Sequence, residues 1–172
     1  MGRLPLEEHD GIAYLQRVFG GGPRDGLFGT DVIVTPVSSN YRLKTLAIDA
    51  FRRYLGRYWS MYGAEFLANW RESVAVPPVL ALCRKPLVQL LRECEDVNLE
   101  SSCEMLTETW DDPLAARQAL EGVFNGSDVD ELSVFSLDDG GIYYGMVVAA
   151  HVKTGKSGKF VGLVTVFDDQ GY

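Results

Sequence analysis

The chain is poor in the residues that crosslink small proteins and in those that ligate metals. Its 172 residues include three cysteines, Cys83, Cys94 and Cys103, and two histidines. The cysteine count is odd and no two are spaced as Cys-x-x-Cys, a pattern typical of reduced thiols rather than of disulfides or zinc sites. We therefore expect a fold that needs no disulfide, no metal and no cofactor.

Long apolar runs are also missing. No stretch approaches the about 20 apolar residues that a membrane-spanning helix needs. The first residues, Met1 to Glu8, lack the apolar segment of a secretion signal. We expect a soluble, cytoplasmic protein that does not engage a membrane.

Positive charge is scarce in the second half of the chain. Residues 1–92 hold twelve Lys or Arg against eight Asp or Glu, whereas residues 93–172 hold four against sixteen, and the whole chain carries −8. Residues 93–139 contain fourteen acids and a single base, Arg117. Like charges at this density repel one another in the compact state, so the segment either serves solubility or presents its field to a basic partner.

The apolar pattern predicts an α+β fold. Apolar residues spaced by three and four between 43 and 62 predict a core helix after Ser38-Ser39-Asn40, and Pro86 and Asp112-Pro113 begin two further helices. Residues 97–110 alternate weakly and favour a strand. The period becomes two from residue 131 onward, with strand-like runs at 132–137, 142–152 and 160–167.

These elements predict about three helices packed on one face of a small antiparallel sheet that ends in a C-terminal three-stranded meander. We expect a single globular domain over residues 1–172. It would comprise a loose N-terminal arm (1–9), a mainly helical part (31–130) and the β meander (131–168).

Two short patterns resemble catalytic machinery. Residues 150–157 match the phosphate-binding loop except at the first position, but such a loop must lead into a helix, and strand-like sequence follows Ser157. This favours a hairpin turn without a nucleotide. His151 falls on the strand face opposite the expected core, where a lone histidine is typically solvent-facing, so we assign no catalytic residue.

The sequence favours a non-enzymatic binding or regulatory protein that engages a basic protein partner, as an inhibitor or immunity protein would. The expected contact surface comprises acidic residues: Glu93, Glu95, Asp96, Glu100, Glu104, Glu108, Asp111, Asp128, Asp130 and Glu131.

Two alternatives stay open. The first is a subunit or assembly factor of a larger complex that uses the aromatic-rich helix 41–62, with contacts from Arg52, Arg53, Arg57, Tyr58, Trp59 and Tyr62. Cations beside aromatics also suit nucleic acid, but the net charge of −8 repels polyanions, so we expect no nucleic-acid partner. The second alternative is a carboxylate- or metal-dependent enzyme built on acid pairs such as Asp138 and Asp139.

Overall fold

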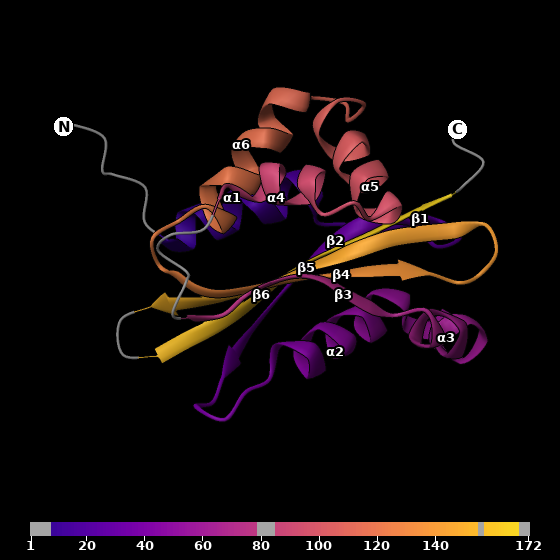
Figure 1. Ribbon diagram of the computed structural model, residues 1–172, viewed down its shortest axis with the longest axis horizontal. Coiled ribbons are helices and arrows are strands. Elements are labelled where there is room, and N and C mark those ends of the chain that lie inside the picture. The colour runs from indigo at the N-terminus through magenta and orange to yellow at the C-terminus, as the bar shows by residue number, and fades with distance from the viewer. Residues whose placement is uncertain (1–7, 79–84, 155–156, 169–172) are drawn as a thin grey trace.

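A central antiparallel sheet lies between two layers of helices (Figure 1). The computed structural model describes residues 8–78, 85–154 and 157–168. Within these ranges the sheet has six strands in the order β1-β2-β6-β5-β4-β3. Their bounds are Gly22–Asp25 (β1), Phe28–Val37 (β2), Arg71–Val76 (β3), Val129–Asp138 (β4), Tyr143–Thr154 (β5) and Ser157–Asp168 (β6).

Both faces of the sheet are buried. Along β5, Met146, Val148 and Ala150 pack against one helical layer, whereas Val147 and Ala149 pack against the other. Strands covered on both sides need apolar residues at consecutive positions, and this explains the long runs of Val, Phe and Ala in β4, β5 and β6.

The first layer contains α1 (Glu8–Phe19), α4 (Leu87–Glu93), α5 (Val97–Thr107) and α6 (Pro113–Phe124). The second layer lies on the opposite face and contains α2 (Leu43–Leu55), the 3₁₀ turn η1 (Gly56–Tyr58) and α3 (Trp59–Ala68). Helix α2 lies directly on the sheet, since a Cβ built on Gly162 would be in ordinary contact with the Cβ of Ala50, at 3.6 Å.

The α+β class and the C-terminal meander predicted from the sequence are confirmed. The helices, however, cover both faces of the sheet rather than one, because the meander is apolar on both sides. The β5–β6 hairpin is also present, since Ser157 begins a strand that pairs antiparallel with β5. Lys156, which belongs to the 150–157 segment that resembles a phosphate-binding loop, lies outside the described residues.

Several boundaries differ from the sequence prediction. The expected strand at 97–110 is wrong, because α5 occupies that stretch and buries Leu99, Cys103 and Leu106 at helical spacing. The long helix predicted to residue 62 ends at Leu55, and α1 begins inside the predicted arm at Glu8. Strands β1 and β3 were not predicted. No helix in the described part of the chain is long and apolar enough to cross a membrane.

Candidate functional site

Exposed carboxylates gather on the layer of α4, α5 and α6, residues 87–124, which we call the acidic layer. It holds nine acids against two bases, Arg92 and Arg117. Glu100, Glu104 and Glu108 are exposed and follow one another at intervals of four, so α5 presents them along one side. Three more predicted contacts are exposed in the same layer: Glu93, Glu95 and Asp111.

Ion pairs neutralise little of this layer. Lys85 approaches Glu93 at 2.7 Å and Arg92 approaches Glu108 at 3.8 Å, but all four side chains are about half exposed, where such pairs stabilise weakly. Hydrogen bonds from Lys85 and Gln89 lower the pKa of Glu93 and keep it charged. The acidic layer therefore keeps its negative field.

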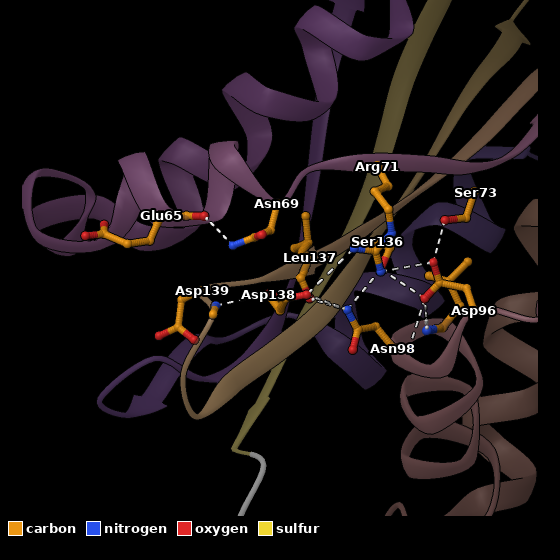
Figure 2. A network of polar contacts seen from close by, with 12 residues as sticks. Glu65, Asn69, Arg71, Ser73, Asp96, Asn98, Ser136, Leu137, Asp138 and Asp139 are labelled. Atoms are coloured by element: carbon orange, nitrogen blue, oxygen red, sulfur yellow. Dashed lines mark hydrogen bonds and ion pairs between the residues drawn. The ribbon is translucent and has the colours of Figure 1, made fainter.

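Asp96, also predicted as a partner contact, is buried in a structural network. Figure 2 shows Arg71 and Ser73 of β3, Ser136 of β4 and Asn98 of α5 gathered around its carboxylate. Ser73 donates to it at 2.6 Å and Ser136 at 3.0 Å. Its side chain is only 8% exposed. Asp96 therefore links two strands to α5 and is not available to a partner.

The same carboxylate caps α5. It accepts hydrogen bonds from the N–H groups of Asn98 and Leu99, two donors that a helix start leaves unpaired. Burial alone would raise the pKa of Asp96, but the hydrogen bonds from Ser73, Ser136 and Leu99, with the charge of Arg71, outweigh it and lower the pKa. Asp96 is thus held ionised inside the fold.

The remaining predicted acids lie at the start of β4, outside the acidic layer. Asp128 precedes the strand and is partly buried. Asp130 pairs with His151, Oδ1 to Nδ1 at 2.5 Å, and its Oδ2 lies 3.8 Å from Lys153 Nζ. Glu131 accepts a hydrogen bond from the Tyr41 hydroxyl at 2.5 Å. The carboxylates of Asp130 and Glu131 are therefore engaged within the fold, and none of the three acids belongs to α4, α5 or α6.

The opposite face is basic. The layer of α2, η1 and α3 with the capping residue Arg42, residues 42–68, which we call the basic layer, holds five bases against Asp49 and Glu65. Arg52 stacks over Trp59 at 5.6 Å and Arg57 over Tyr58 at 5.1 Å, and Tyr58 also contacts Tyr62. Five of the six alternative contact residues therefore form two groups, Arg52 with Trp59 and Arg57 with Tyr58 and Tyr62, whereas Arg53 pairs with Asp49 at 3.4 Å. Tyr58, Trp59 and Tyr62 are partly buried.

His151 is not solvent-facing as the sequence suggested. Its side chain is 15% exposed, and the Tyr41 ring meets it edge-on at 4.5 Å between centroids. Burial, followed by the hydrogen bond to Glu131 and nearby negative charge, raises the pKa of Tyr41 and keeps it neutral. His151 and Glu131 are paired across β4 and β5, a register that the sequence alone did not give.

A polar depression of about 400 Å³ opens beside this cluster. It is lined by Val37, Ser38, Ser39, His151, Lys153, Ser157 and Gly158. Sequence reasoning could have grouped His151 with Lys153, because residues two apart in a strand share a face. It could not have shown that Ser38 and Ser39, which follow β2, line the same depression as His151 and Lys153.

No protein-family model, curated protein or solved structure matches this chain. Within the described ranges, no group of three or more His, Cys, Asp or Glu side chains is arranged to hold a metal ion.

Proposed function

We propose that this is a non-enzymatic binding protein that engages a basic protein partner through its acidic layer. The single observation that supports the proposal is the separation of charge by the sheet: residues 87–124 on one side hold nine acids, including the buried Asp96, against two bases, and residues 42–68 on the other side hold five bases against two acids. Acids that served solubility alone would not need to gather on one layer.

The separation lets each face act independently. Helical layers on opposite sides of a sheet are at least one helix diameter apart, about 10 Å. This exceeds the Debye length of about 8 Å at physiological ionic strength, so the basic layer does not cancel the field at the acidic surface. A basic partner would be steered to the acidic layer during diffusional encounter.

The acidic layer also offers apolar contacts. Val97, the first residue of α5, is 75% exposed, and Leu114, near the start of α6, is 66% exposed. Protein interfaces combine apolar side chains with a polar surround. Glu100, Glu104 and Glu108 lie in sequence between these two residues, so the surface suits a folded protein with both cations and apolar side chains.

A second candidate function is a subunit or assembly factor of a larger complex that contacts its neighbours through the basic layer. Met61 on α3 is 63% exposed and Leu67 is 39% exposed, close in sequence to the Arg52–Trp59 and Arg57–Tyr58 stacks. These exposed apolar side chains favour a contact there as well.

Affinity capture from the native cells with two charge-matched variants tests the proposal. Glu100, Glu104 and Glu108 are changed together to Lys in the first variant, and Asp49, Glu65 and Glu72 in the second. All six residues are exposed, and both variants change the net charge equally.

We expect one basic protein to be retained by the wild type and by the Asp49, Glu65 and Glu72 variant, and to be lost from the α5 variant. Equal retention by both variants would contradict the proposal. A partner lost only from the second variant would support the assembly-factor alternative instead.

A further inference from the structure

The depression beside His151 has the composition of a ligand site. It lies between the end of β2 with the two serines after it and the ends of β5 and β6 that meet in their hairpin. Its lining includes three serine hydroxyls, the ammonium group of Lys153 and the imidazole of His151. None of the described lining residues is a carboxylate, although the chain as a whole carries −8.

His151 is held in one orientation. Its Nδ1 is engaged by Asp130 at 2.5 Å, and Tyr41 packs edge-on against the ring. Its Nε2 lies beside Gly158, another lining residue, so closely that a Cβ built there would be 2.1 Å away. Only glycine leaves room for the imidazole at this point. Nε2 is therefore on the side of the ring that borders the depression.

We propose that this depression binds a small ligand bearing an oxyanion, either a phosphate ester or a carboxylate. Lys153 Nζ supplies a charge, since it is 66% exposed and only loosely paired with Asp130 at 3.8 Å, which leaves it able to turn toward a ligand. Ser38 and Ser39 are exposed and line the same depression, and their hydroxyls can donate to anionic oxygens.

The position of His151 assigns it to the site. Asp130 engages its Nδ1, so Nε2 is the ring nitrogen left for a ligand, and a ring that carries both protons donates Nδ1–H to Asp130 and Nε2–H to an oxyanion. Asp130 and Glu131 on β4 and Tyr41 before α2 face the ring, together with Lys153 on β5. Glu131 accepts the hydrogen bond of the Tyr41 hydroxyl, so its carboxylate is already engaged.

Titration calorimetry with inorganic phosphate in one arm and acetate in another measures binding to the depression directly. Stronger binding of phosphate assigns a phosphate ester, and stronger binding of acetate assigns a carboxylate.

Three variants locate the site. Lys153→Ala, an exposed change that spares the fold, should weaken binding about tenfold. His151→Gln removes the ring nitrogen beside Gly158 and should also weaken binding. Lys159→Ala is the matched control, because it removes the same charge from the same hairpin one residue after Gly158, on the other face of β6, and should bind as the wild type does.

Circular dichroism of each variant establishes that it is folded. If His151→Gln does not fold, the comparison of Lys153→Ala with Lys159→Ala decides the question. Absence of measurable heat with the wild type for both anions, or equal weakening by Lys153→Ala and Lys159→Ala, would overturn the proposal. Binding by folded His151→Gln as tight as by the wild type would overturn the assigned role of His151. The proposal is independent of the acidic layer, so neither result bears on the protein partner.

Discussion

Asp96 combines three roles in one side chain: it caps α5, accepts from two serine hydroxyls and pairs with Arg71. Local sequence does not distinguish this carboxylate from its exposed neighbours Glu93 and Glu95. Its partners Ser73 and Ser136 come from two distant strands, so only the tertiary structure shows that the acid is structural.

The Asp96 network predicts a specific pH dependence of stability. The folded-state pKa is lowered, so the carboxylate stabilises the protein above the unfolded value of about 3.9, and this contribution is lost as the pH falls through the folded pKa. Asp96→Asn keeps a capping side chain but no charge. We expect the stability difference between wild type and Asp96→Asn to shrink below about pH 4, as measured by urea unfolding across a pH series.

Asp96→Ala removes the cap as well, and leaves Ser73 and Ser136 without their acceptor. It should cost about 2–3 kcal/mol at neutral pH, more than Asp96→Asn. A stability difference for Asp96→Asn that stays constant from neutral to acid pH would show that the carboxylate is not held ionised by these contacts.

Among the elements, α5 shows most clearly where sequence patterns are ambiguous. The strand prediction rests on a weak alternation of apolar and polar residues around Met105, Leu106 and Thr107. The structure instead buries Leu99, Cys103 and Leu106, which are spaced as on one face of a helix. The helix at 113–124 was predicted correctly because Asp112 and Pro113 mark its start in the local sequence. The meander was predictable for the same reason, since its turns and β-branched runs are local.

Strand β3 and the second helical layer depend on non-local pairing. Arg71–Val76 is short and only its partner β4 fixes it in the sheet. The apolar character of both faces of β5 is visible in the sequence, but the pattern does not identify α2 as the element that covers the second face. Sequence reasoning therefore gave the class and the meander, whereas the layering needed the packed structure.

Replacing glycine by alanine should have opposite effects on stability at two positions, Gly56 between α2 and α3 and Gly122 in α6. Gly56 has φ 55° and ψ −121°, a conformation that side chains rarely adopt, and a Cβ there meets open space. Gly56→Ala should therefore destabilise the protein through backbone strain, by about 1–3 kcal/mol.

Gly122 in α6 is the control, because it is exposed, helical and also has open space around it. Gly122→Ala should stabilise by about 0.5–1 kcal/mol. Chemical denaturation measures both changes, and destabilisation of similar size at both positions would contradict the assignment of strain to Gly56.

At the scale of the whole molecule, the sheet separates charge as well as burying apolar surface. The charge asymmetry between the two halves of the sequence becomes a difference between two faces, because the segment 42–68 packs on one side and the segment 87–124 on the other. The acids at the start of β4 do not follow this rule. Of these acids, Asp130 and Glu131 form a separate cluster with His151 and Tyr41. The total charge of the segment does not distinguish this cluster from the exposed acids.

The central claim is that the acidic layer attracts a basic partner by its field. The most direct test is the association rate with the captured partner, measured by stopped flow at low and at physiological salt. We predict that the association rate of the wild type falls steeply as salt rises. When Glu100, Glu104 and Glu108 are changed to Lys, the rate should be lower by about tenfold or more and should depend little on salt. The variant at Asp49, Glu65 and Glu72 should keep the steep dependence. A flat wild-type dependence, or equal loss in both variants, would contradict the claim.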